Sequence, residues 1–318
     1  MDNLTTPPLT SQSLESEPTS DEVLQHRTDI KHKYSWQNPQ TFLLLVSIVV
    51  PIAFASWQAL LNNFVIEKAA FTGADIGLLQ SVREIPGFLA FTVVFVLLFI
   101  REQKFMIVAL AMLSVGVAIT GFFPSVLGLL LTTLLMSTGF HYFETLKQSL
   151  SLQWLSKEEA PEFLGKLIAV GALASLLTYG ALWSMLEIFK LNYWHIYLIT
   201  GSVALAVTVF MAVAFPQFES TTIQNKNLVL RKRYWLYYAL TFMSGARRQI
   251  FTVFAGFLMV EKFHYSAADI TLLFLVNYVF NFLFAKKIGR FIGLVGERKA
   301  LIFGWCFKKY AETKQVEF

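Results

Sequence analysis

The sequence is poor in cysteine and in charged residues. Cys306 is the only cysteine among 318 residues, so no disulfide can form within the chain and a cysteine metal cluster is implausible. Only 15% of the residues are charged, whereas 55% are hydrophobic. The chain also lacks a Walker loop, a glycine-rich dinucleotide loop after a strand and a nucleophile elbow. We therefore expect neither an enzyme nor an ATP-driven pump, and no catalytic residue, cofactor or metal ion.

Long apolar segments make up most of the chain. A bilayer core about 30 Å thick takes roughly 20 residues of helix. The short alternating segments of a membrane β-barrel are not seen. Eight apolar segments lie near residues 41–61, 76–100, 105–122, 126–148, 163–188, 195–215, 234–260 and 267–285, and a ninth begins near 299 and stops short. The sequence thus predicts an all-α, polytopic membrane helix bundle.

The loops between these segments differ in charge. Those on one side carry 16 Lys and Arg residues, and the opposite loops carry only Lys68, Lys190 and Lys262. The positive-inside rule then places the N-terminus in the cytoplasm and the spans in the cytoplasmic (inner) membrane. We assign the net charge of +5 to the lipid surface and expect no nucleic acid as partner. Residues 1–40, rich in Ser, Thr, Pro and acids, read as a disordered cytoplasmic tail with no evident signal peptide.

One segment occurs twice. Glu67–Leu79 returns as Glu261–Leu273, shifted by 194 residues without a gap, and 7 of the 13 positions are identical. Each copy stands between two apolar segments. A repeat at this spacing in a hydrophobic chain predicts two homologous membrane halves, as in many secondary transporters.

The repeat also predicts how a helix begins. Thr72 and Ser266 are each followed three residues later by an acid, Asp75 and Asp269, and then by an apolar run. This is the pattern of a capping box, in which the hydroxyl and the carboxylate satisfy free backbone N–H groups at the helix start.

Six spans, a basic linker near Gln217–Arg233 and a second half that repeats the first resemble the major facilitator superfamily of transporters. Gly289–Lys299 looks like the family's cytoplasmic loop signature, although Gly293 stands where the family usually has Asp. Members of this family have twelve spans, so we expect a chain truncated in its ninth span. The expected divisions are a tail (1–40), a six-helix bundle (41–215), a linker (216–233), a partial second bundle (234–307) and a polar, possibly non-native end (308–318).

Polar residues at membrane depth are candidates for solute binding. Arg247 and Arg248 lie mid-way along the seventh span, where they would either attract an anionic substrate or form a structural ion pair. Gln58, Asn62 and Asn277 would hydrogen-bond the substrate or join helices. The resemblance implies that the first, fourth and seventh helices line a central cavity.

Titratable residues are candidates for proton coupling. His141 and Glu144 lie on one face of the fourth span, where a carboxylate beside an imidazole could take up and release protons; the alternatives are a helix end and an incomplete metal site. Arg83 and Glu84 in the second span are either a gate or proton site, or an interfacial pair at a bend near Pro86.

The resemblance implies a secondary transporter that moves a small solute, anionic if Arg247 or Arg248 binds it, across the membrane by alternating access, with protons as the natural driver. Its partners would be the solute and the lipid bilayer. Two alternatives remain: a non-transporting sensor or assembly protein on the same scaffold, and an inactive truncated fragment.

Overall fold

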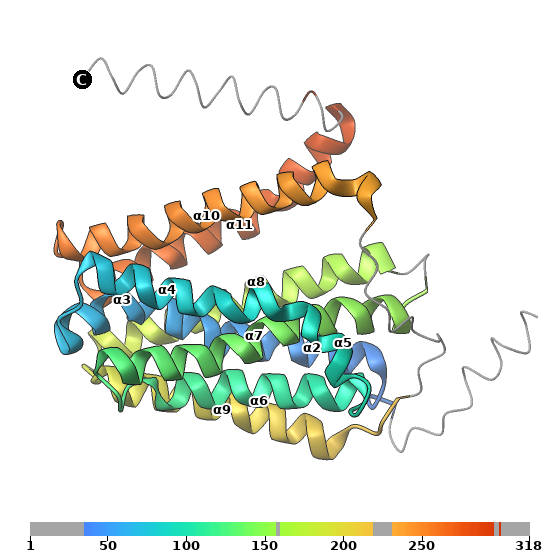
Figure 1. Cartoon of the computed structure of the whole chain (residues 1–318), viewed down its shortest axis with the longest axis horizontal. Helices are drawn as coiled ribbons and strands as arrows, with labels where there is room; N and C mark the ends of the chain where they lie inside the picture. The colour runs from blue at the N-terminus through green and yellow to red at the C-terminus, as the bar shows by residue number, and fades with distance from the viewer. Residues whose placement is uncertain (1–34, 157–159, 219–230, 296–298, 300–318) are drawn as a thin grey trace, which may run out of the picture.

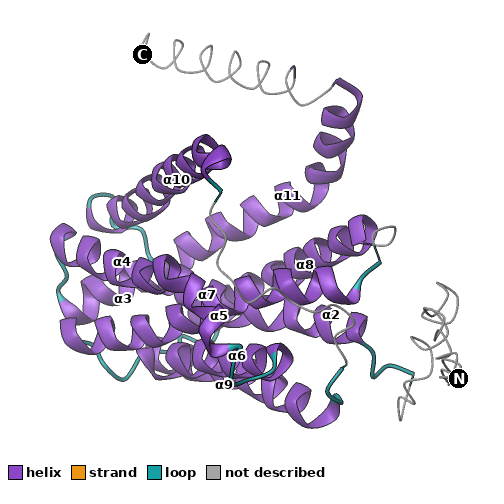
Figure 2. Cartoon of the chain, turned by 45° about the vertical axis from the view of Figure 1, so that its right-hand side comes forward, coloured by secondary structure: helices purple, strands orange, loops and turns teal. Residues whose placement is uncertain are grey.

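The computed structural model describes residues 35–156, 160–218, 231–295 and 299, and every regular element within these residues is helical (Figure 2). The helices are α2 (Pro39–Val50), η1 (Pro51–Ala55), α3 (Ser56–Ala69), α4 (Gly73–Phe88), η2 (Leu89–Thr92), α5 (Val93–Val96), α6 (Glu102–Thr120), α7 (Val126–Trp154), α8 (Ala160–Glu187), α9 (Tyr193–Ala214), η3 (Lys232–Tyr234), α10 (Trp235–Glu261) and α11 (Ala267–Val295).

Six of these segments are long and apolar enough to cross a membrane, judged over the described residues. They are Pro39–Ala69, Gly73–Val96, Glu102–Thr120, Val126–Trp154, Phe163–Glu187 and Tyr193–Ala214. Helices α10 and α11 follow with 27 and 29 residues. The prediction of an all-α, multi-pass membrane protein is confirmed. The expected tail, most of the linker and the ninth apolar segment lie outside the described residues.

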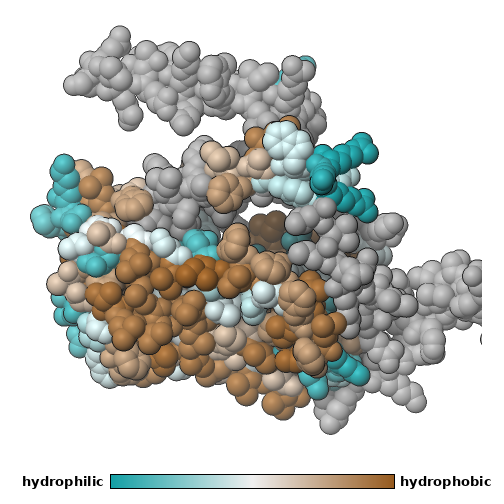
Figure 3. All heavy atoms as spheres, in the orientation of Figure 1, coloured by the Kyte–Doolittle hydropathy of each residue, from teal (hydrophilic) through white to brown (hydrophobic). Residues whose placement is uncertain are grey.

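The helices run back and forth between two ends of the molecule (Figure 1). We call one end the turn end, because short connections at 70–72, 121–125, 188–192 and 262–266 join the helices there. The other end, which we call the linker end, holds the connections that follow α5, α7 and α9. Helices α10 and α11 lie on one side of the bundle formed by α2 to α9. Brown, apolar side chains cover much of the bundle surface between the two ends (Figure 3).

The predicted capping boxes are present in both copies of the repeat. At the start of α4, the Thr72 backbone N–H donates to Asp75 Oδ2 at 2.9 Å, and the Asp75 N–H donates to Thr72 Oγ1 at 3.3 Å. At the start of α11, the corresponding distances between Ser266 and Asp269 are 2.9 and 3.1 Å. The sequence prediction is confirmed, because in each copy both free donors are satisfied reciprocally.

The residues just before these caps repeat as well. Ala70 and His264, which are 194 residues apart, both have left-handed backbones, with φ of 52° and 56°. One residue later, the backbone N–H of residue 71 donates to the Val65 carbonyl at 3.0 Å, and that of Tyr265 donates to the Met259 carbonyl at 3.2 Å. Each bond spans one residue more than the six-to-one bond of a Schellman motif, and it likewise closes the helix end after a left-handed residue. The duplicated sequence therefore builds the same helix–turn–helix corner twice.

Close contacts between helices use glycine. Gly116 of α6 faces α7 so closely that a Cβ atom there would lie 2.7 Å from the backbone nitrogen of Met136. Gly139 of α7 lies equally tightly against Leu113 of α6, and Gly201 of α9 against Ala118. Small residues let helices approach in lipid, where packing rather than hydrophobicity drives association. Helix α6 is thereby held between α7 and α9.

Two spans contain irregular turns. The first span passes through a π-helical turn, η1, that begins at Pro51 and separates α2 from α3. The Ser56 hydroxyl donates to the Ile52 carbonyl at 2.7 Å inside this turn. In the second span, Pro86 precedes the end of α4 at Phe88, after which the chain forms the 3₁₀ turn η2. Proline removes a backbone donor and clashes with the preceding turn, which explains both irregularities.

Two glycines should respond to the same substitution with opposite signs. Gly116→Ala is expected to lower the free energy of unfolding by about 1–3 kcal/mol, because the new methyl group overlaps the α7 backbone. Gly180→Ala in α8, where a Cβ atom meets nothing within 4 Å, should leave stability unchanged or raise it by up to about 1 kcal/mol. Thermal unfolding of the purified protein in detergent, followed by circular dichroism, checks both. Equal effects of the two substitutions would contradict the packing described for α6 and α7.

Candidate functional site

The two copies of the repeat meet at the turn end. The side-chain amide of Asn63, in α3, donates to the backbone carbonyl of Tyr265 at 2.7 Å. Phe257, in α10, lies against the start of α4, since a Cβ atom at Gly73 would be 3.9 Å from its ring. Residues 63 and 257 are 194 apart, so each copy places the same position against the capped turn of the other copy.

This contact has the character of a two-fold interface. In such an interface, position i of one partner contacts position j of the other, and the reverse also holds. A residue on the axis faces its own equivalent. Asn62 and Gly256 are equivalent, and a Cβ atom at Gly256 would lie 2.9 Å from the Asn62 amide nitrogen. The axis therefore passes near these two residues.

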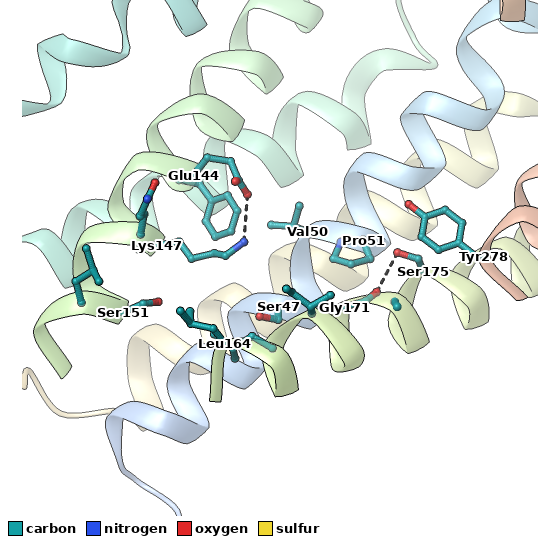
Figure 4. A pocket seen from close by; sticks show the side chains of 16 residues that line it. Ser47, Val50, Pro51, Glu144, Lys147, Ser151, Leu164, Gly171, Ser175 and Tyr278 are labelled. Carbon is teal, nitrogen blue, oxygen red and sulfur yellow. Dashed lines mark hydrogen bonds and ion pairs between the residues drawn. The ribbon is translucent and has the colours of Figure 1, made fainter. Parts of the chain in front are cut away.

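A pocket of about 600 Å³ lies between the first half and α11 (Figure 4). Its lining comes from α2 and η1, from α7, from α8, and from α11 through Tyr278. The lining residues are Ser47, Val50, Pro51, Phe143, Glu144, Lys147, Gln148, Ser151, Leu152, Leu164, Leu167, Ile168, Gly171, Ala172, Ser175 and Tyr278. Glu144 stands 10 residues before the end of α7, or about 15 Å along the helix from the linker end.

The polar groups of the pocket lie mainly on α7. Lys147 Nζ is 3.4 Å from Glu144 Oε1 and 5.4 Å from the centre of the Phe143 ring. The ammonium group is thus held between a carboxylate and an aromatic face. Ser151, one turn further on, has a buried hydroxyl oxygen with no hydrogen-bond partner. Figure 4 shows Glu144 and Lys147 extending from α7 toward Val50.

The other walls of the pocket are apolar. The hydroxyls of Ser47 and Ser175 donate to the carbonyls of residues 43 and 171 in their own helices, at 3.0 and 2.9 Å. Leu164, Leu167 and Ile168 add hydrocarbon from α8. The pocket therefore combines one polar side with an apolar surface, which suits a small amphipathic molecule.

The structure divides the predicted proton-coupling residues between two places. Glu144 lines the pocket, whereas His141 is directed at α4, where a Cβ atom on Gly87 would lie 2.7 Å from its ring. Arg83 and Glu84 are paired at 2.5 Å, and Glu84 remains 45% exposed. His141 lies within electrostatic reach of Glu84, Arg83 and Glu144. The imidazole thus stands between the ion pair on α4 and the carboxylate in the pocket.

None of the predicted solute-binding residues whose side chains are described lines the pocket. Asn62 faces Gly256 at the contact between the repeats. Gln58 is half-buried in α3, and Asn277 is exposed on α11, next to Tyr278. The side chains of Arg247 and Arg248 lie outside the described residues, although their backbone belongs to α10.

Several pocket residues are absent from the sequence-based candidates. Pro51, an isolated proline in an apolar run, was the signal for the irregular turn that faces the pocket. Gly171 and Ser175 read as helix-packing residues, and Gly171 does lie near α2, since its Cβ atom would be 3.5 Å from the Ser47 carbonyl. The same small side chains also leave the space that the pocket occupies.

The composition of the site limits its chemistry. Among the described side chains, no group of three His, Cys, Asp or Glu residues is placed to hold a metal ion. No protein-family model matches the chain, and no curated protein matches it significantly. The arrangement of the described residues alone supports a binding site with one carboxylate and one ammonium group.

A bulky residue at the axis should open the turn end. Gly256→Leu would drive a side chain into Asn62 and separate α10 from α3. Spin labels at two equivalent exposed positions, introduced by Lys68→Cys and Lys262→Cys in a Cys306→Ser background, report the separation by pulsed electron paramagnetic resonance. We expect the mean distance to rise by roughly 2 Å or more, because side-chain size sets interaxial distance between about 8 and 10 Å.

The control is Gly165→Leu in α8, where a Cβ atom has no neighbour within 4 Å. It should leave the distance between the labels unchanged. An unchanged distance in Gly256→Leu as well would show that α3 and α10 do not touch at this point.

Proposed function

We propose that this protein is a secondary transporter that moves a small solute across the cytoplasmic membrane, coupled to protons, by alternating access. The proposal rests above all on the pocket of about 600 Å³ between membrane-spanning helices, which holds the Glu144–Lys147 pair. Ionisable residues at membrane depth are costly, and they mark solute or ion pathways when they face a cavity. The duplicated halves and the resemblance to the major facilitator superfamily support the same conclusion.

The lining favours a small amphipathic solute. Lys147 supplies three N–H donors to an anionic group, and Glu144 accepts from a cationic or hydroxyl group. Because Glu144 and Lys147 are paired with each other, a solute that binds one of these side chains also leaves the other free to bind a second group of the solute. The apolar walls from α8 then accommodate hydrocarbon.

Protons are the coupling ion that the described residues favour. Glu144 lies in the pocket, one helical turn from His141, which in turn lies beside Glu84. In this proposal the solute takes the Lys147 ammonium as its partner, and a proton takes the place of that ammonium at the Glu144 carboxylate. Competition between solute and proton at Glu144 is the simplest form of coupling.

Alternating access assigns a role to the turn end. The repeats touch there through Asn63–Tyr265 and Gly73–Phe257, whereas the pocket lies toward the linker end. We assign this arrangement to the state that is closed at the turn end. If the basic linker end is cytoplasmic, the pocket faces inward in this state.

The experiment is a solute-uptake screen in proteoliposomes under an imposed proton gradient, with and without a protonophore. Uptake that exceeds empty vesicles and collapses with the protonophore supports the proposal. Glu144→Gln keeps the shape of the side chain and removes its protonation, so gradient-driven uptake should fall to the level of empty vesicles. Solute exchange without a gradient should persist, since it needs no net proton movement.

The matched control is Glu187→Gln. Glu187 forms a similar pair with Lys190, three residues on, at 2.7 Å, but at the turn end of α8 and away from the pocket. Loss of the Glu187 charge should leave uptake unchanged. Equal uptake by wild-type protein and Glu144→Gln would remove the proton role, and a screen in which no solute enters above background would remove transport.

A further inference from the structure

Several buried polar atoms in the first half have no hydrogen-bond partner in the protein, and three of them lie on α3, α4 and α7. They are Trp57 Nε1 in α3, Gln80 Oε1 in α4 and Thr133 Oγ1 in α7. Trp57 and Thr133 are fully buried, and Gln80 is 8% exposed. Buried polar groups without partners are rare, because each loses its hydrogen bonds to water without replacement. Three in one region require an explanation.

The contact of Trp57 with Arg83 and the helical spacing of the other two residues place all three near the Arg83–Glu84 pair. The Arg83 guanidinium carbon lies 6.0 Å from the centre of the Trp57 ring. Gln80 precedes Arg83 by three residues, so it lies on the same face of α4, one turn nearer the turn end. The Ser137 hydroxyl donates to the Arg83 carbonyl. Thr133 precedes Ser137 by four residues and occupies the matching turn of α7.

The chemistry of the three atoms is complementary to water. The indole N–H only donates, the amide oxygen only accepts, and the hydroxyl does either. A buried water molecule typically makes about three hydrogen bonds and is found where polar groups are otherwise unsatisfied. On the linker-end side, the rings of Phe54 and Phe140 stack at 4.5 Å between η1 and α7 and border this region with hydrocarbon.

We propose that Trp57, Gln80 and Thr133 bind ordered water between α3, α4 and α7, beside the Arg83–Glu84 pair. This water is separate from the pocket, because none of the three residues lines it. It solvates a charged pair within the bundle. The site does not depend on the proposed transport function, although it would place a proton donor next to Glu84.

Radiolytic hydroxyl-radical labelling with mass spectrometry tests the site in the protein in detergent micelles. X-rays convert bound water to radicals that oxidise the side chains next to it, including those that bulk solvent does not reach. We expect oxidation of Trp57, which is fully buried, and none of Met106, which is equally buried but belongs to α6, outside the three helices of the proposed site. Methionine is at least as reactive toward these radicals as tryptophan, so its protection would exclude access through general opening.

Replacing the two other water ligands completes the test. The double variant Gln80→Leu with Thr133→Val should lower Trp57 oxidation by at least about threefold, because a site needs two to four polar partners to hold water. Thr138→Val is the control, since the Thr138 hydroxyl already donates to the Leu134 carbonyl at 2.7 Å and should not affect the label.

If the double variant does not fold, as circular dichroism would show, each single variant is measured instead. Absence of Trp57 oxidation in the wild-type protein overturns the proposal, and so does oxidation that persists unchanged in the variants. Neither result bears on solute uptake, so the proposed water site and the proposed transport function are tested independently.

Discussion

Asn63 and Phe257 occupy the same position in the two copies of the repeat, and each contacts the capped turn of the other copy. This exchange holds α10 and α11 against the bundle at the turn end, and the pocket between α7, α8 and α11 lies further toward the linker end. Helix α11 also packs along α8, where the Tyr179 ring lies 5.3 Å from the rings of both Phe274 and Tyr278. Asn63 and Phe257 are both buried at this contact, with 1% and 3% of their surface exposed. Phe257 belongs to the same buried apolar cluster as the first half, so the contact is part of the core.

Three ion pairs of the described residues join partners that are close in sequence, and two of them lie within a single helix. Glu144 pairs with residue 147, Glu187 with residue 190, and Arg83 with its neighbour Glu84. A pair within one helix lowers the cost of carrying charge into the membrane without tying that helix to another.

The sequence predicted what depends on local chemistry. The capping boxes at Thr72 and Ser266 follow from residues three apart and are confirmed. The apolar lengths follow from the thickness of the bilayer, and six of the eight predicted spans are confirmed among the described residues. The direction of a side chain between helices is a different matter. The sequence places His141 and Glu144 on one face of a helix. In the structure, however, the His141 ring lies against Gly87 of α4, whereas the Glu144 carboxylate lines the pocket. Tertiary packing decides which helix lies on each side of α7, and this cannot be inferred from a single sequence.

For the same reason, the sequence did not predict that Pro51 and the small residues of α8 line a pocket. In an apolar run, a proline indicates an irregular turn, but it does not say that the turn faces a hollow. Gly171 and Ser175 fit close packing and a cavity equally well, and the structure uses them for both. These features lie at one level of the bundle: the π turn at residues 51–55, the pocket and the small face of α8. A helix bends most easily where its regular hydrogen bonding is interrupted, so the first span is softest beside the pocket. The same span contacts the second copy of the repeat at Asn63, toward its other end.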